Sequence, residues 1–148
     1  MCYRLTDRLD SSEFFYRQSV KIKPKKLTAL ANLALVLILK NELDKAEEIY
    51  NRILKTDPKD PDGYFGLAEI MLRTGRYELA SSNAMKAYER WKITNPSYAG
   101  DALFYAGLGY LLNGDPGNSK KYFEKAMKLG TKIPDEYLEK AGMKKNEK

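Results

Sequence analysis

Small and hydrophobic residues recur along this chain with a period longer than a single helix. Ser12, Ala46 and Ala80 lie 34 residues apart, and similar neighbours recur around each of them. A fixed period of this length indicates an array of repeated helical units. The segment 27–39 is almost wholly apolar, and at about 13 residues it is too short to span a membrane, which takes roughly 20. We therefore expect a helix that is packed on several sides by its neighbours.

Asparagine and glycine mark the predicted turns between helices. Asn41, Gly75 and Gly114 stand between helical segments, and both residue types are favoured in the left-handed backbone conformation that such turns need. Three further pairs predict helix starts, because an aspartate or asparagine caps a helix well and proline is favoured in its first turn. These pairs are Asp60–Pro61, Asn95–Pro96 and Asp115–Pro116.

The segment 29–58, ALANLALVLILKNELDKAEEIYNRILKTDP, resembles a tetratricopeptide repeat, a helix-turn-helix unit. In that family a leucine and a small residue on the first helix meet a small residue on the second helix, and an aromatic residue follows four positions later. Small residues let the two helices approach closely. Ala84 departs from this pattern, because it stands where the aromatic residue is expected, and Tyr88 is the candidate to fill the gap. The matching residues are Leu33–Ala34, Leu67–Ala68 and Ala106–Gly107, then Ala46, Ala80 and Ser119, with the aromatic residues Tyr50 and Phe123.

The resemblance covers residues 11–145 and implies an all-α fold, a superhelix of TPR-like repeats (an α-solenoid) with a C-terminal capping helix. We expect a single domain, 1–148, because the length leaves no room for a second domain of ordinary size. Ala80 and Ser119 are 39 residues apart, so we expect one added turn on the second helix of repeat two and a longer loop. The predicted units are a partial repeat at 11–24 with only a stub of its first helix, repeats at 27–58, 61–96 and 100–131, and a capping helix at 134–145.

The composition offers little basis for catalysis. The chain has no histidine, so the usual general base at neutral pH and the commonest metal ligand are both missing. The single cysteine, Cys2, excludes an internal disulfide and fits a reducing compartment. Asp60 and Glu69 match part of a calcium-loop template, but Pro58 stands at its first ligand position. We expect no enzyme activity, no cofactor and no metal.

The net charge of +6 is concentrated at the two ends of the chain. Residues 1–26 and 118–148 each carry a net charge of +4, whereas the centre carries −2. A nucleic-acid surface needs a basic stripe with stacking aromatic residues on the binding face, and the lysines of 119–132 fit a solvated second helix better. The N-terminus is charged where a signal peptide would be apolar. We expect a cytoplasmic protein without a membrane span, with RNA binding as a less favoured alternative.

The resemblance also implies where a partner binds, because positions on the first helix of each repeat line the concave groove of this family. Carried over, they give a mostly apolar surface with an acidic edge. Some of these apolar residues could instead pack into the core. The predicted groove residues are Ala31, Leu35, Asp62, Phe65, Glu69, Leu72, Arg73, Asp101, Phe104 and Leu108, together with Thr28, Ile38, Leu39, Leu111 and Leu112.

One subclass of the family grips the C-terminal carboxylate of its partner with lysines, asparagines and an arginine. This chain keeps only Asn32, while Ala31, Leu35, Asp62 and Tyr105 stand where the other clamp residues are expected. A carboxylate clamp is therefore not predicted. An apolar groove with an acidic edge fits a hydrophobic or aromatic peptide segment that carries a basic residue or two.

Two functions remain open from the sequence. The first is a non-catalytic interaction module, an adaptor, scaffold or chaperone-like holder that binds such a peptide. The second is a structural module that self-associates, because an incomplete first repeat exposes an apolar edge that another copy can cover. A fragment of a longer repeat protein would have the same pattern.

Overall fold

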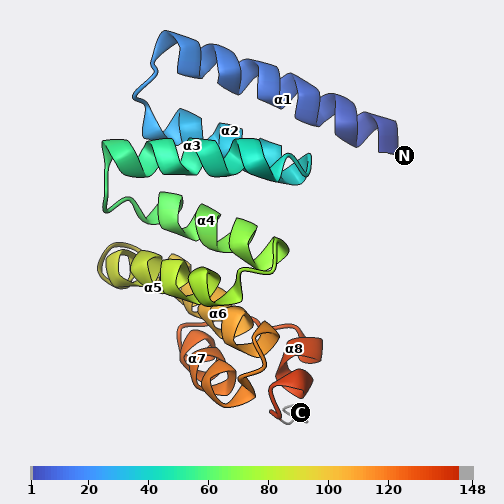
Figure 1. The fold of residues 1–148 in the computed structure, drawn as a ribbon, viewed down its shortest axis with the longest axis vertical. Helices are drawn as coiled ribbons and strands as arrows, with labels where there is room; N and C mark the ends of the chain where they lie inside the picture. Colours follow the sequence, from blue (N-terminus) through green and yellow to red (C-terminus); the bar gives the residue numbers. More distant parts are fainter. Residues whose placement is uncertain (1, 144–148) are drawn as a thin grey trace. The chain divides into compact units, whose positions relative to one another are not determined.

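The computed structural model describes residues 2–143, and within them it contains eight helices and no strand. The all-α repeat fold predicted from the sequence is thus confirmed. The last part of the predicted capping helix, residues 144 and 145, lies outside the described residues. Figure 1 labels the helices, which are α1 (Cys2–Ile22), α2 (Leu27–Leu39), α3 (Leu43–Thr56), α4 (Pro61–Arg73), α5 (Tyr77–Thr94), α6 (Pro96–Leu112), α7 (Pro116–Lys128) and α8 (Asp135–Lys140).

The chain divides into two compact units, and the boundary falls within α4, between Gly66 and Leu67. We call residues up to Gly66 unit 1 and residues from Leu67 unit 2. Whether both belong to one domain, as the length suggests, stays a prediction.

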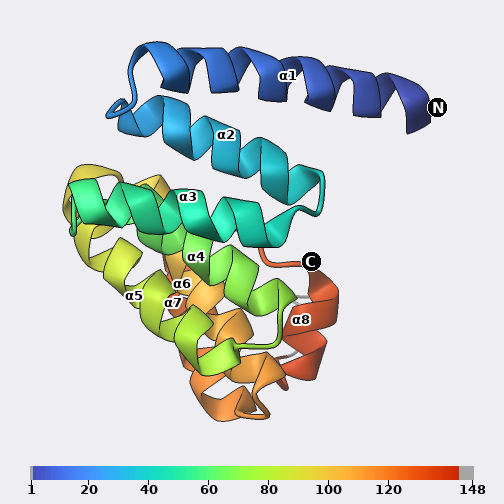
Figure 2. The same cartoon turned by 45° about the horizontal axis from the view of Figure 1, so that its top comes forward.

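Unit 1 is built on the apolar helix α2, which packs against α1 and α3 (Figure 2). Leu30 and Leu37 of α2 are fully buried, and so are Ala34 of α2 and Ala46 of α3. The Tyr50 ring fills the space beside Gly66, since a Cβ atom added there would lie 2.1 Å from the ring carbon Cζ. The small residues and the aromatic residue of the repeat pattern therefore have the packing roles that the sequence predicts.

Unit 2 is held together by the close approach of α5, α6 and α7. Ser81 of α5 donates a hydrogen bond of 2.9 Å from its hydroxyl to the carbonyl of Ala106 in α6. Ala84 lies in a buried cluster with Ala68 and Ala106. The missing aromatic residue at position 84 is thus replaced by a contact of three alanines. Tyr88, the candidate to fill this place, packs instead against a neighbouring cluster around Leu103.

The three predicted turns adopt the left-handed conformation. Asn41 has φ = 61°, and Gly75 and Gly114 have φ = 79° and 82°. In each turn a backbone N–H returns to a carbonyl five residues earlier, as from Glu42 to Leu37 at 2.8 Å. This arrangement satisfies carbonyl groups that the end of a helix leaves unpaired.

The predicted helix caps are also present. The side chain of Asp60 accepts a hydrogen bond of 2.8 Å from the Gly63 N–H, and that of Asp115 accepts one of 3.0 Å from the Asn118 N–H. Asn95 accepts a longer bond of 3.4 Å from Tyr98. Asp60 therefore has a structural role that explains its place in the partial calcium-loop pattern.

Two details differ from the sequence-based expectation. Residues 2–22 form one continuous helix, α1, so the expected stub of a separate first helix is wrong. The added turn on α5 is confirmed, since α5 has 18 residues and α3 has 14. The longer loop after it is wrong, because Asn95 alone separates α5 from α6 and the remaining residues lengthen α6 to 17. Asn95 both ends α5 and caps α6, so the two helices are joined without a loop.

Candidate functional site

In unit 1 the predicted groove residues form an apolar strip on α2. Leu35 and Leu39 are 47% and 58% exposed, and Ala31 is half-buried. These three residues follow one another at a spacing of four, so they lie along one face of the helix. Leu30, Leu33 and Leu37 of the same helix are buried, so a leucine pair this exposed is available to a ligand.

The start of α4 adds an acidic residue to the predicted site in unit 1. Asp62 is exposed and Phe65 is half-buried. Displacement of water by the surrounding protein, and then the neighbouring Asp60 carboxylate, raise the pKa of the Asp62 carboxyl above its ordinary value. A cationic partner would offset both effects, because a nearby positive charge favours the ionised form of the carboxyl.

In unit 2 three charged side chains lie near enough to Tyr105 to influence the pKa of its phenol. Burial is the main reason that the pKa of Tyr105 is raised to about 12; Glu69 and Asp101 raise it further and Arg73 opposes them. Glu69 accepts a bond of 3.0 Å from Arg73 Nη2, one turn away on α4. The structure thus brings three predicted groove residues of unit 2, Glu69, Arg73 and Asp101, to one place.

The apolar groove residues of unit 2 serve the core as well. Leu108 is 8% exposed and belongs to a buried cluster with Phe123, against which Leu72 also packs. The ring of Phe104 is half-buried, with its centroid 5.7 Å from that of Phe123 and 5.9 Å from that of Tyr137 in α8. Leu108 therefore offers little surface to a ligand, and Phe104 offers one edge of its ring.

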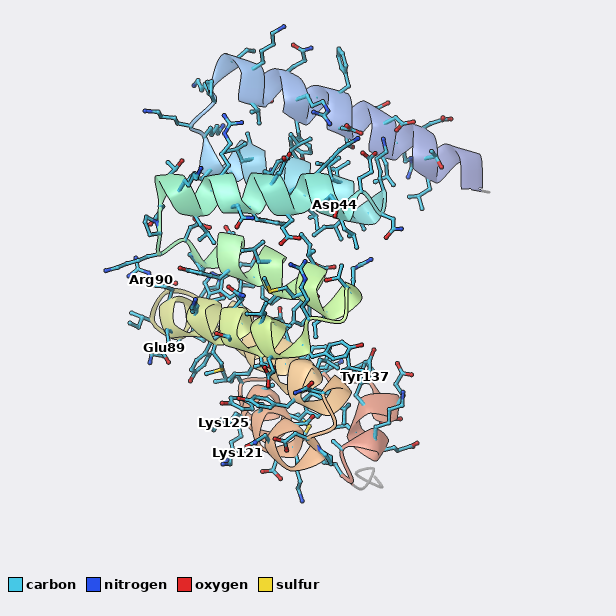
Figure 3. The ribbon with its side chains drawn as sticks, in the orientation of Figure 1. Asp44, Glu89, Arg90, Lys121, Lys125 and Tyr137 are labelled. Atoms are coloured by element: carbon cyan, nitrogen blue, oxygen red, sulfur yellow. The ribbon has the colours of Figure 1, made fainter. Side chains whose placement is uncertain are left out.

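Two tyrosines of this site were not selected from the sequence. In the sequence, Tyr105 stands out only as the residue at the position of a clamp arginine, and nothing singles out Tyr137. Figure 3 shows Tyr137 on α8. Its proximity to Phe104 depends on how α8 folds back onto α6, for which the sequence carries no signal. Whether all these residues form one peptide-binding site stays a prediction.

Burial also raises the pKa of the Asp101 carboxyl above its ordinary value of 3.8. The folded state then keeps this proton to a higher pH than the unfolded state, so the free energy of unfolding falls as the pH rises through that window. We expect Asp101→Asn to be more stable than the parent chain at pH 7 and nearly equal to it at pH 3. Thermal melts across this range measure the difference, and a gap that is the same at both values would contradict it.

The lysine-rich helix α7 presents a different surface in unit 2. Lys121 and Lys125, labelled in Figure 3, are exposed. Lys125 Nζ lies 5.5 Å from the ring centroid of Tyr122, which stacks on Tyr110 at 5.2 Å between centroids. One lysine thus sits over an aromatic ring of its own helix, an internal cation–π contact.

Two further features, metal binding and membrane insertion, concern residues 2–143, the part of the chain that the structure describes. That part of the chain holds no cluster of three or more histidine, cysteine, aspartate or glutamate side chains placed to bind a metal ion. None of its helices has the length and apolar character needed to cross a bilayer.

Comparisons with known proteins identify the repeat. A family model described as tetratricopeptide repeat matches residues 7–64, and a second model with the same description matches residues 49–80. Together these matches include the three-helix stack of unit 1 and the start of unit 2.

The chain is also similar to one curated protein and to solved structures. Type IV pilus assembly protein PilF of Pseudomonas aeruginosa is 28% identical over 127 residues, which cover 86% of this chain and 49% of that protein. The chain thus spans about half the length of this curated relative. A solved structure from a functional characterization of Pseudomonas aeruginosa pilF has a TM-score of 0.79 at 24% identity, covering 93% of this chain and 64% of that one. A MamA RS-1 ArsTM double mutant has a TM-score of 0.69 at 16% identity, covering 86% and 70%. Both structures support the same helical repeat fold.

Proposed function

Because this chain belongs to the tetratricopeptide repeat family, whose members are generally non-catalytic protein-interaction modules, we propose that it binds a peptide segment of a partner protein through the first helices of its repeats. The segment is apolar or aromatic and carries a lysine or arginine. The chain then acts as an adaptor or assembly factor. Its similarity to a protein named for pilus assembly favours a partner that is itself a component of a protein assembly.

The observation that carries this proposal is the exposed leucine strip of α2. Leu35 and Leu39 leave apolar surface in water at positions that the family uses for peptide contacts. Burying such surface contributes about 25 cal/mol per Å², so a short apolar segment can gain several kcal/mol from this strip and its surroundings before entropy costs. Asp62, at the start of α4 and also in unit 1, supplies the negative charge that selects for a basic residue.

The test starts from peptides displayed as a library against the whole purified chain. We expect the selected sequences to share an apolar or aromatic residue and at least one lysine or arginine. A synthetic peptide of that consensus then provides the dissociation constant by calorimetry. Leu35→Glu should weaken its binding at least tenfold, because the substitution places a charge in the apolar contact.

A matched control separates binding from folding. Leu79 of α5 is 51% exposed, close to the value for Leu35, and is not a predicted groove residue. Leu79→Glu should leave the dissociation constant unchanged. Asp62→Lys should weaken a basic peptide, with a larger loss at low salt, where charges are less screened. If Leu35→Glu and Asp62→Lys both bind the peptide as the parent chain does, the first helices of unit 1 are not the recognition surface.

A further inference from the structure

Helix α1 has two distinct faces, and only one of them is covered within unit 1. Lys40, which directly follows α2, forms ion pairs of 2.6 Å with Asp10 and with Glu13, so the covered face is fixed on α2. The hydrogen bond from Lys40 is the main cause of the lowered pKa of Glu13. The half-buried residues on this covered face recur at helical spacing: Leu9, Ser12, Glu13, Tyr16, Ser19 and Val20.

The opposite face of α1 is aromatic at its centre and exposed. Phe14, Phe15 and Ile22 are 67%, 64% and 74% exposed, which makes this one of the most apolar exposed parts of unit 1. The helix also runs past the end of α2, as Figures 1 and 2 both show. Two adjacent phenylalanines left in water at mid-helix are costly, and contiguous apolar surface of this kind marks interaction sites.

Two opposite charges on this outer face are placed symmetrically about Phe14. Asp7 lies seven residues before Phe14 and Lys21 lies seven residues after it, so all three share one stripe of the helix. Each charge is about 10 Å from Phe14 along the helix axis. An identical helix placed antiparallel across Phe14 therefore sets Asp7 of each copy opposite Lys21 of the other. A parallel pair would instead set lysine against lysine.

We propose that the outer face of α1 pairs with α1 of a second copy of this chain, antiparallel and centred on Phe14. The phenylalanines of the two copies form the apolar centre of this interface, and the two Asp7–Lys21 pairs flank it and fix its direction. This pairing is isologous, the arrangement of most homodimers. It uses a surface distinct from the proposed peptide-binding residues, so either proposal can fail alone.

The expected affinity follows from the size of the surface. A helix of 21 residues is about 31 Å long, and one face of it buries less than the roughly 1,200 Å² typical of stable complexes. We therefore expect a dissociation constant in the micromolar range. The measurement is sedimentation equilibrium of the full chain from micromolar concentrations to about 10⁻⁴ M.

A charge swap tests the geometry independently of folding. Asp7→Lys and Lys21→Asp each create two like-charge contacts per dimer, and each should raise the dissociation constant roughly tenfold. The double variant, Asp7→Lys with Lys21→Asp, restores opposite charges and should recover most of the parent affinity. Glu48→Lys and Lys55→Asp change the same charges on exposed positions of α3, and they should leave the dimer intact.

Three outcomes of the concentration series and the charge swap would overturn the pairing. They are a chain that stays monomeric over the whole concentration range, a dimer that both single reversals leave unchanged, and a double variant no tighter than either single reversal. Phe14→Ser with Phe15→Ser should give a monomer with unchanged helicity by circular dichroism, because both rings are in water in the single chain. If that variant still dimerises, the interface lies on another surface.

Discussion

Replacing Phe123 with alanine is expected to destabilise unit 2 by about 3–5 kcal/mol, the cost typical of removing a buried phenylalanine. The ring is fully buried, lies 5.7 Å from the ring of Phe104 between centroids, and packs against Gly107. A Cβ atom on Gly107 would come within 2.6 Å of that ring, so α6 and α7 are shaped around it. Urea unfolding monitored by circular dichroism measures the loss.

Exposed phenylalanines provide the control for this substitution. Phe15→Ala removes the same side chain from a position that is 64% exposed, and we expect a change within about 0.5 kcal/mol. The two variants should be compared at low protein concentration, where self-association of α1 does not contribute. Equal destabilisation by both would show that Phe123 does not form the core of unit 2.

The turns and caps could be predicted from the sequence because each depends on a local property of one or two residues. Asn41 and Gly75 tolerate a positive φ that other residues resist. Asp60 and Asp115 carry side-chain oxygens that reach the first free N–H groups of a helix. No distant contact is needed for either effect, so the repeat boundaries follow from the chain itself.

The extent of α1 and the path after α5 could not be predicted in the same way. The sequence before Ser12 is compatible both with one continuous helix and with a short separate helix. Which of the two forms depends on whether the residues before Asp10 pack against another element. After α5, the extra residues could form a loop or lengthen α6. The longer α6 is accompanied by the burial of Trp91 at the end of α5, whose ring lies 5.3 Å from that of Tyr98 in α6.

Only part of the candidate site could be predicted from the sequence, for a related reason. Helix periodicity places Leu35 and Phe104 on equivalent faces of their first helices, yet Leu35 is exposed and Phe104 packs against Tyr137. The difference comes from α8, whose Tyr137 ring lies 5.9 Å from the ring of Phe104 between centroids. Periodicity describes which face a residue occupies, but the next element along the chain decides whether that face stays in water.

Replacing Gly109 with alanine is expected to destabilise unit 2 by about 1–3 kcal/mol through overpacking, although glycine to alanine inside a helix ordinarily stabilises by about 1 kcal/mol. The added Cβ would lie 2.1 Å from Ser81 Oγ and 2.8 Å from the backbone carbonyl oxygen of Tyr77. The hydroxyl can rotate, at the cost of its bond to Ala106, but the carbonyl is fixed within α5. The α5–α6 contact must therefore open.

Gly117→Ala is the matched control, because a Cβ atom there meets only Asp115 Oδ1 at an ordinary contact distance of 3.7 Å. Gly117 lies in the first turn of α7 and is exposed, so alanine should leave the chain equally or more stable through its higher helix propensity. The two substitutions add the same methyl group, but only Gly109→Ala should lower the urea midpoint. A rise for both variants would mean that α5 and α6 are not in contact at Gly109, since propensity alone would then decide the outcome.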